Sequence, residues 1–191
     1  MILVLHSYRR CPFAIRVRMT LEEKGVLYSV VEESLRSPSA SLLAVNPSGK
    51  VPVLLVDGVA MPESAVITAF LEEKFPVPAL GSPGEWTEWC DSVFKPDLDL
   101  FKYKWKELGG EEQARLVLRL EKHLETLEST LAQGKFLEGD TFSLADIHVF
   151  PFYRQLTKCE GFLERFSYPR ANAWLDRITE RASFVRVMRK S

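Results

Sequence analysis

A stretch rich in proline and glycine divides this chain into two parts with different patterns. Residues 76–84 read Pro-Val-Pro-Ala-Leu-Gly-Ser-Pro-Gly, which cannot sustain a helix and is typical of a linker between domains. Short apolar runs that suggest strands precede this stretch, and helical periodicity alone follows it. We therefore expect two domains, at 1–75 and 85–191, joined by the linker 76–84.

The first part alternates candidate strands with candidate helices. Strands are expected at 2–5, 26–31, 51–56 and 59–61, and helices at 11–24, 39–45 and 64–75. Asp57-Gly58 favours a two-residue hairpin turn between the last two strands, and Gly25 fits the end of the first helix. The order β-α-β-α-β-β-α predicts an α/β domain. Strands separated by helices should pair in parallel, and the hairpin should add an antiparallel edge.

The second part is expected to be all-α. Its clearest helix, at 111–133, has apolar residues at spacings of 3 and 4, namely Val117, Leu120, Leu124, Leu127 and Leu131. Another covers 85–108 and should be kinked or divided by Pro96. Ser143 and Asp146 form a candidate capping box that opens a helix to about residue 156, with the Asp146 carboxylate reaching back to the helix start. Two short helices, at 169–180 and 183–190, complete the pattern.

Composition narrows the classes of partner. The 191 residues carry 25 Lys+Arg against 26 Asp+Glu, so charge gives no reason to expect nucleic acid or an anionic membrane as a partner. The first apolar run is too short for a signal peptide, and no run approaches the ~18 residues of a membrane span. The cysteines, Cys11, Cys90 and Cys159, are few, scattered and odd in number. We therefore expect a cytoplasmic protein with no metal site and no disulfide framework.

The segment that ends the first strand carries the strongest chemical signal. Cys11 precedes Pro12, which fits the first turn of a helix, so Cys11 is the expected N-cap residue. The unpaired N–H groups and the positive end of the helix dipole there favour a thiolate over a thiol. A buried, inert cysteine is the alternative. Since Ala14 stands three residues after Cys11, no Cys-x-x-Cys disulfide can form, and a redox cycle needs an external thiol.

Two further segments each offer a binding function beside a plain structural one. A cis Val51–Pro52 bond would expose the backbone of Val51 to an extended peptide ligand, whereas a trans proline would only mark a strand edge. Ser64 is the expected N-cap of the third helix. Free N–H groups there can hold a carboxylate, and Glu63 can meet an ammonium group, so the pair suits an α-amino-acid head group.

Taken in order, these motifs resemble the cytosolic glutathione S-transferase superfamily. The chain is most similar to its cysteine-type members, the omega-like and monothiol glutaredoxin-like enzymes, in a bacterial style. The resemblance covers the whole chain and implies a thioredoxin-like first domain followed by an all-α domain. It rests on Cys11-Pro12-Phe13-Ala14 with arginines soon after, Asn46-Pro47, Val51-Pro52-Val53-Leu54, Glu63-Ser64-Ala65 and Ser143-Leu144-Ala145-Asp146.

The resemblance implies a role for each motif. Cys11 would be the nucleophile that forms a mixed disulfide with glutathione, the co-substrate. Val51, ahead of a cis Pro52, would pair with the cysteinyl backbone of glutathione. Glu63 and Ser64 would hold the γ-glutamyl end.

Other contacts in the same groove are less defined by the pattern. Phe13 and Lys50 would line it. Omega-like enzymes use a lysine near the second helix to meet the glycyl carboxylate, but Pro38 stands at that position. Arg36 or Lys50 would have to substitute.

The expected function is glutathione-dependent thiol transfer or reduction, with a small electrophile or disulfide as second substrate, in a homodimer. Conjugation of glutathione, with Ser7 or Tyr8 donating to its thiolate, is one alternative. A non-catalytic binding module like the stringent starvation proteins is another, although those lack the Cys-Pro pair. A dithiol oxidoreductase is disfavoured for want of a second thiol near Cys11 in the sequence.

Residues outside these motifs are expected to be structural. They are Cys90, Cys159, His148 and the aromatic set Trp86, Trp89, Phe101, Tyr103 and Trp105, which would form core or an apolar wall for an electrophile.

Overall fold

The structure, a computed structural model, describes residues 1–34 and 36–189, except for the side chains at positions 163 and 164. It divides into two compact units, one formed by residues 1–81 and 181–189 and the other by residues 82–180. The expected second domain, 85–191, differs from this division at its C-terminal end, because the segment that begins at Arg181 belongs with the first unit. The predicted end of the last helix, at residue 190, lies outside the described residues.

The first unit is built on a four-stranded sheet in the order β2-β1-β3-β4. Its strands are β1 (Leu3–Ser7), β2 (Ser29–Glu32), β3 (Val53–Val56) and β4 (Val59–Pro62). As expected, β1 pairs with β2 in parallel and β3 with β4 in antiparallel fashion.

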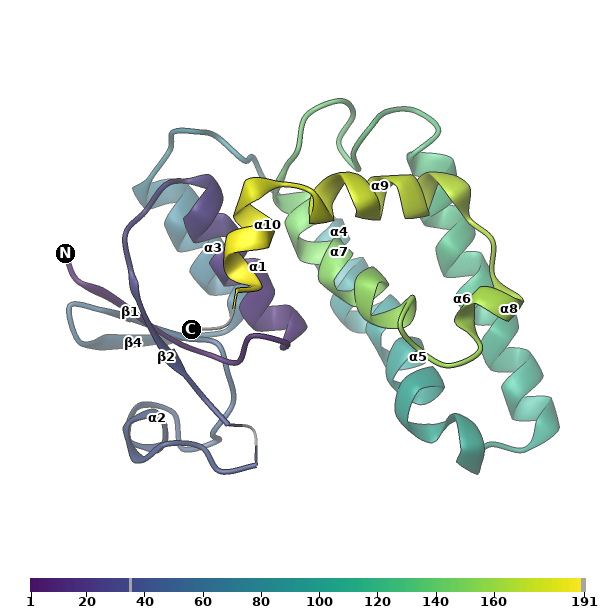
Figure 1. The fold of residues 1–191 in the computed structure, drawn as a ribbon, viewed down its shortest axis with the longest axis horizontal. Helices are drawn as coiled ribbons and strands as arrows, with labels where there is room; N and C mark the ends of the chain where they lie inside the picture. Colours follow the sequence, from purple (N-terminus) through teal and green to yellow (C-terminus); the bar gives the residue numbers. More distant parts are fainter. Residues whose placement is uncertain (35, 190–191) are drawn as a thin grey trace. The chain divides into compact units, whose positions relative to one another are not determined.

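The third strand departs from the expected direction. Strand β3 runs antiparallel to β1, although a helix precedes it. The helix α2 (Ala40–Val45) lies at the end of the sheet where β2 finishes, so β3 starts there and returns (Figure 1). The parallel rule therefore holds for β1 and β2 alone.

Two helices cover one face of this sheet. They are α1 (Pro12–Glu23) and α3 (Ser64–Lys74), and Gly25 follows α1 with a φ of 62°, as expected of a residue that ends a helix. Their apolar sides form one core with the sheet, made of Leu3, Leu5, Val17, Leu21, Leu54, Ile67 and Leu71.

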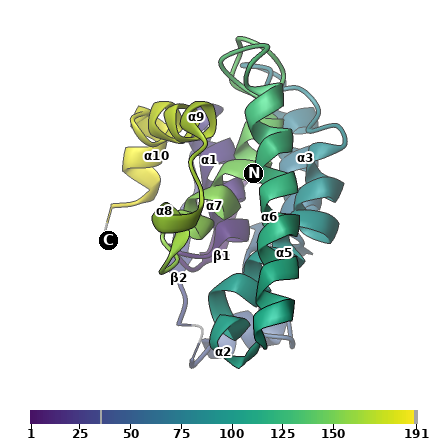
Figure 2. The ribbon, with the colours of Figure 1, turned by 90° about the vertical axis from the view of Figure 1, so that its right-hand side faces the viewer.

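The C-terminal helix α10 (Ala182–Val187) packs against α1 (Figures 1 and 2). The Arg181 guanidinium donates to both carboxylate oxygens of Glu23, at 2.8 and 2.7 Å. Because this fork pairs the end of α1 with the start of α10, it explains why the last residues join the first unit.

The second unit is built from helices joined by loops, and its described residues form no strand longer than the isolated bridge between Phe136 and Gly139. Its segments are α4 (Trp86–Glu88), η1 (Trp89–Phe94), α5 (Lys95–Asp99), η2 (Leu100–Lys104), η3 (Trp105–Glu107), α6 (Gly110–Thr130), α7 (Leu144–Leu156), α8 (Phe162–Arg165) and α9 (Pro169–Thr179). No described helix is both long and apolar enough to span a bilayer. Figure 2 shows α6 from the side, with its axis running from top to bottom of the view.

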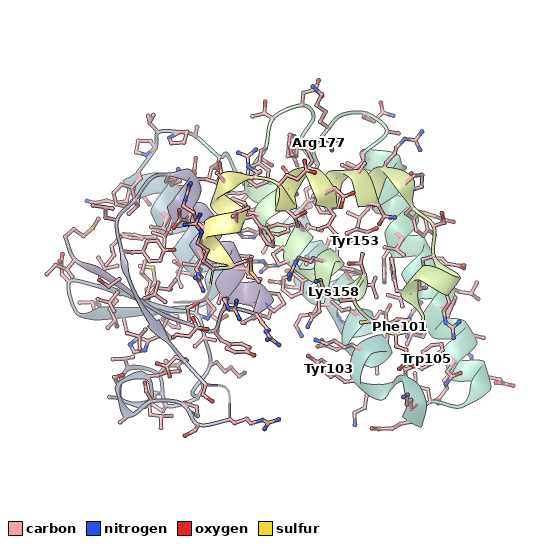
Figure 3. The ribbon with its side chains drawn as sticks, viewed as in Figure 1. Phe101, Tyr103, Trp105, Tyr153, Lys158 and Arg177 are labelled. Atoms are coloured by element: carbon pink, nitrogen blue, oxygen red, sulfur yellow. The ribbon has the colours of Figure 1, made fainter. Side chains whose placement is uncertain are left out.

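The region expected as a helix kinked or divided by Pro96, 85–108, is helical from Trp86 to Glu107 without an intervening loop, but its winding changes along its length. Wide π-helical segments, η1 and η2, flank α5, and Pro96 sits in the first turn of α5. The aromatic side chains of Phe101, Tyr103 and Trp105 follow one another at the end of this region (Figure 3). In α6 the first buried apolar residue is Leu116 rather than Val117, one position earlier than the pattern indicated.

The start of α7 has the predicted capping box. The Asp146 carboxylate accepts hydrogen bonds from the Ser143 N–H at 2.9 Å, from the Leu137 N–H at 2.9 Å and from the Trp174 indole at 2.8 Å. Burial raises the pKa of Asp146 above its ordinary value, even though these hydrogen bonds act in the opposite direction. Farther along α7, the buried His148 ring lies 2.7 Å from the Thr87 hydroxyl, which fits its structural role.

We predict that Asp146→Ala lowers the free energy of unfolding by about 3 kcal/mol, because several buried donors lose their acceptor at once. Urea unfolding followed by circular dichroism measures the change. Asp140→Ala is the matched control, since Asp140 is exposed and accepts one hydrogen bond, from the Lys135 N–H at 3.2 Å. Equal losses in both variants would contradict the prediction.

Candidate active site

Cys11 is the N-cap residue of α1, with Pro12 in the first turn, as predicted from the sequence. The Cys11 N–H donates to the Tyr8 carbonyl at 2.9 Å, and the Cys11 carbonyl accepts from the Ile15 N–H at 2.9 Å. The residue is half-buried, and it is a thiol rather than part of a disulfide. Its Sγ lies 3.8 Å from the carbonyl oxygen of Val51. The backbone of the Val51–Pro52 segment therefore contacts the sulfur.

A pocket of about 320 Å³ opens beside this contact. All six residues expected to bind glutathione line it, namely Phe13, Lys50, Val51, Pro52, Glu63 and Ser64. Three residues for which no binding role was predicted also line it, Asn46, Ser48 and Pro62. Each of these belongs to or adjoins a motif already singled out. The available signal was the polar side chains of Asn46 and Ser48 on either side of Pro47, and for Pro62 its position next to Glu63. The Val51–Pro52 peptide bond is cis.

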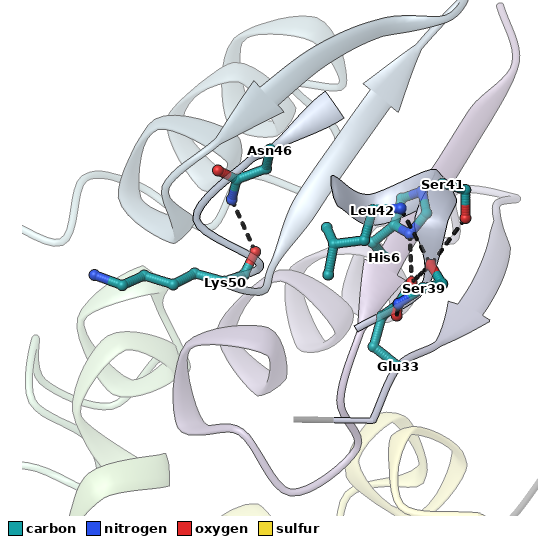
Figure 4. A network of polar contacts seen from close by, with 7 residues as sticks. All are labelled: His6, Glu33, Ser39, Ser41, Leu42, Asn46 and Lys50. Atoms are coloured by element: carbon teal, nitrogen blue, oxygen red, sulfur yellow. Dashed lines mark hydrogen bonds and ion pairs between the residues drawn. The ribbon is translucent and has the colours of Figure 1, made fainter. Parts of the chain in front are cut away.

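Side-chain hydrogen bonds within one loop shape the rim of the pocket. The Asn46 amide donates to the Lys50 carbonyl at 2.9 Å (Figure 4), and the Ser48 hydroxyl donates to the Asn46 side-chain oxygen at 2.9 Å. Gly49 has a φ of 64°, and a Cβ there would lie 3.1 Å from Cγ of Pro38. The loop thus needs glycine at this position, both for its backbone conformation and for the close approach of Pro38.

The opposite motif differs from the expected cap. Glu63, not Ser64, is the N-cap residue of α3, and Ser64 is the first helical residue. The reason is the backbone of Glu63, whose φ of 71° is uncommon for a residue with a side chain. Such a conformation costs on the order of 1–3 kcal/mol and is typical of functional sites.

A buried cation lies behind this corner. Arg16, in α1, is fully buried, and its guanidinium donates to the Ser64 hydroxyl at 3.4 Å. The same guanidinium stands over the Phe13 ring, 5.1 Å from the centroid. Because Phe13 and Ser64 both line the pocket, the positive charge of Arg16 favours an anionic group near them. Arg16 is one of the arginines that follow the Cys11-Pro12-Phe13-Ala14 motif, and no binding role was expected of it.

Ser7 and Tyr8 are the candidate hydrogen-bond donors to the glutathione thiolate in the alternative conjugation reaction. Ser7 is fully buried at the end of β1, and Tyr8 packs with Cys11 against the cluster of Leu42, Val51 and Val53. Neither is among the residues that line the pocket, and Cys11 is not among them either, since its sulfur adjoins the pocket through the Val51 carbonyl. Arg36 and Pro38 do not line it either, whereas Lys50 does.

A second cavity, of about 880 Å³, lies within the helical unit and is chemically different. Phe101, Tyr103 and Trp105 line it together with several lysines, and Figure 3 shows them with Lys158. Cys159 also lines it, but burial raises the pKa of the Cys159 thiol, which disfavours the thiolate. The pocket beside Cys11 is therefore the better candidate for thiol chemistry.

These features together define a class of protein. A mixed sheet, a cysteine that caps the first helix, a Val-Pro segment facing it and an appended helical unit are those of a thioredoxin-like protein with a second, all-α domain.

Comparison with known proteins agrees. A family model described as "Glutathione S-transferase, N-terminal domain" matches residues 5–83, and "Glutathione S-transferase, C-terminal domain" matches residues 97–182. The chain is 32% identical to the probable glutathione S-transferase DHAR1, cytosolic, of Oryza sativa over 182 residues, 92% of this chain and 83% of the relative. It is 29% identical to glutathione S-transferase U28 of Arabidopsis thaliana, over 98% of this chain and 89% of the relative.

Solved structures show the same relationship. The Tau class glutathione S-transferase MiGSTU of mango, Mangifera indica, is similar with a TM-score of 0.85 and 25% identity, over 98% of this chain and 93% of that one. Rice GST1 (OsGSTU1) in complex with glutathione has a TM-score of 0.81 and 29% identity, over 100% of this chain and 93% of that one. The chain belongs to the glutathione S-transferase family, and the expected glutathione-dependent transferase is confirmed at that level.

We predict that Gly49→Ala weakens glutathione affinity by about threefold to tenfold, because its Cβ meets Pro38 and its positive φ is strained for alanine. Titration calorimetry with glutathione measures the loss. Gly58→Ala is the control, since Gly58 also has a positive φ, 86°, but nothing lies within 4 Å of its Cβ position. Both variants should lose about 1 kcal/mol of stability, and only Gly49→Ala should lose affinity.

Proposed function

We propose that this protein is a cysteine-type glutathione transferase that reduces small disulfides and dehydroascorbate, with Cys11 as the nucleophile. The observation that carries the proposal is the position of the Cys11 sulfur. It lies 3.8 Å from the Val51 carbonyl, and Val51 itself lines the pocket that holds every expected glutathione-binding side chain. A thiol at a helix N-cap is placed where the helix dipole favours the reactive thiolate.

The reaction is an exchange in two steps. The Cys11 thiolate attacks the glutathionyl sulfur of a mixed disulfide, so that a Cys11–glutathione disulfide forms and the substrate leaves as its thiolate. A second glutathione thiolate then attacks that disulfide, which restores the Cys11 thiolate and releases glutathione disulfide. The mixed disulfide is thereby reduced to a thiol, and one glutathione is oxidised together with the glutathionyl group already present. With dehydroascorbate, the Cys11 thiolate adds to a carbonyl carbon, and a first glutathione thiolate attacks the Cys11 sulfur of the adduct, so that a Cys11–glutathione disulfide forms and ascorbate leaves. A second glutathione then releases glutathione disulfide as above, so two glutathione molecules are oxidised. Glutathione must supply the second thiol because Ala14 stands three residues after Cys11.

The pocket offers a partner for each part of glutathione. Glu63 meets the ammonium group of the γ-glutamyl end, and Ser64 with the first N–H groups of α3 meets its carboxylate. The Val51 backbone pairs with the cysteinyl residue, and Phe13 packs beside it. Lys50 meets the glycyl carboxylate, since it lines the pocket and Arg36 does not.

Competing chemistries have less support. Conjugation needs a donor to the glutathione thiolate. Ser7 is fully buried, which leaves Tyr8, beside Cys11, as the one donor of the two that the sequence offered. A non-catalytic module of the stringent-starvation-protein type would leave the thiol of Cys11 at the start of α1 without a role. Relatives named DHAR, such as that of rice, favour the proposed thiol chemistry, whereas relatives of the Tau type keep conjugation as the second candidate.

Other parts of the assignment are proposals of the same kind. We infer a homodimer, a cytoplasmic location, and glutathione binding by the domain 1–75 with the helical domain supplying the second-substrate site. One curated relative is named cytosolic and another chloroplastic. The curated relatives named here are plant proteins, so the bacterial style inferred from sequence stays a prediction.

Incubation with glutathione disulfide tests the proposal. We expect an intact-mass shift of one glutathionyl group on the wild type, and none on Cys11→Ser. Cys159→Ser is the control and should react like the wild type, because the raised pKa of Cys159 disfavours its thiolate. Modification of Cys11→Ser to the wild-type extent would contradict Cys11 as the nucleophile.

Activity assays separate the reaction classes. Reduction of a small disulfide and of dehydroascorbate should fall at least about 100-fold in Cys11→Ser, in line with the loss of a covalent nucleophile. Conjugation of an aromatic electrophile that exceeds disulfide reduction in the wild type would instead favour the second candidate.

A further inference from the structure

A buried ionisable pair lies beside the start of α2, and the proposed chemistry does not use it. His6, in β1, and Glu33, which follows β2, have side chains that are each 2% exposed, with Nδ1 of His6 2.7 Å from Oε1 of Glu33. Burying such a pair costs free energy, and apolar residues of similar size often stabilise a core as well or better. The pair therefore calls for a reason other than stability of the sheet.

The Glu33 carboxylate is fully engaged. Besides His6, it accepts from the Ser39 N–H at 2.9 Å and from the Ser39 hydroxyl at 2.8 Å (Figure 4). Burial raises the pKa of Glu33, but the hydrogen bonds from His6 and Ser39 outweigh it, so the pKa lies below its ordinary value. Glu33 is thus an anion at neutral pH, and since a carboxylate only accepts, Nδ1 of His6 is the donor.

Ser39 connects Glu33 to the helix α2 through hydrogen bonds. Its hydroxyl accepts from the Leu42 N–H at 3.1 Å and so caps α2. The helix has six residues, of which Leu42 alone is buried. A helix this short has little stability of its own. Its position must therefore come from contacts at its ends and from Leu42.

The far end of α2 becomes the rim of the pocket. The Asn46 N–H donates to the Leu42 carbonyl at 2.7 Å, and Asn46 begins the loop that runs through Lys50 to Val51. Leu42 packs against Val51 in the cluster that also holds Cys11. A shift of α2 would therefore move the rim and the carbonyl that faces the Cys11 sulfur.

We propose that Glu33, held by His6, is a positioning residue for the glutathione site: it fixes Ser39 and thereby sets α2, the Asn46–Lys50 loop and Val51. This rests on the proposed glutathione pocket. Neither side chain touches the ligand, and the effect is on affinity rather than on the chemical step.

The test is glutathione binding by Glu33→Gln and Ser39→Ala in the full chain, well below the unfolding temperature. Glutamine replaces one acceptor oxygen with a donor, so the His6 or the Ser39 contact is lost. We expect the Kd and the KM for glutathione to rise about threefold to tenfold, with kcat at saturating glutathione within about twofold of wild type. Ser39→Thr keeps a hydroxyl and should restore near wild-type affinity. Amide hydrogen exchange should quicken in α2 and the 46–50 loop.

A matched pair elsewhere controls for simple destabilisation. In the helical unit, Asp97 lies 2.9 Å from Nε2 of His123, and both residues are buried. Asp97→Asn should lower stability comparably and leave the Kd for glutathione unchanged. An unchanged Kd in both Glu33→Gln and Ser39→Ala, or an equal rise in Asp97→Asn, would overturn the positioning role.

The wild type separates this outcome from the proposed function. If the wild type itself fails to bind glutathione, the proposed function is wrong and the positioning role falls with it. If the wild type binds and the variants bind equally well, the positioning role alone is wrong.

Discussion

The hydrogen-bonded register of β1 with its two neighbours decides where a site can form. His6 pairs with Val31 of β2 on one side and with Val53 of β3 on the other. The carboxyl end of β1 thus leads to Cys11 while the residues just before β3, including Val51, arrive at the same edge of the sheet. Because side chains alternate along a strand, a slip of one residue would turn His6 and Val53 to the wrong face. The contact between the Cys11 sulfur and the Val51 carbonyl depends on this register.

Buried charged groups of the same unit hold residues of the pocket and of its rim in place. Arg16 supports Ser64 and Phe13, and Glu33 supports Ser39 and through it α2. Each charged group is expensive to bury without partners, and each is hydrogen-bonded to a residue that lines the pocket or holds its rim. The pocket therefore combines side chains that face a ligand with polar groups that hold those side chains in place, which limits the reorganisation needed on binding.

Local signals in the sequence predicted local structure well. Pro12 indicated the start of α1 and Cys11 as its cap, and the Ser143–Asp146 spacing indicated the capping box of α7, since both depend on residues a few positions apart. Predictions failed where distant contacts decided. The sequence did not reveal that β3 runs antiparallel to β1, because strand pairing joins residues far apart in the chain. It also did not reveal the positive φ of Glu63, which makes that residue rather than Ser64 the cap of α3, or the π-helical segments η1 and η2 on either side of α5.

The sequence by itself determined the order of elements, the division near residues 76–84, the cysteine at a helix start and the motifs expected to bind glutathione. Each of these features depends on residues that are close together in the sequence, so local conformational preferences and motif patterns are enough to predict it. Only the tertiary structure brought Phe13, Lys50, Val51 and Ser64 around one pocket, joined α10 to α1 through Arg181 and Glu23, and buried His6 against Glu33. Those pairings join residues far apart in the chain, and the free energy that selects them exists once the sheet has formed and its core has closed.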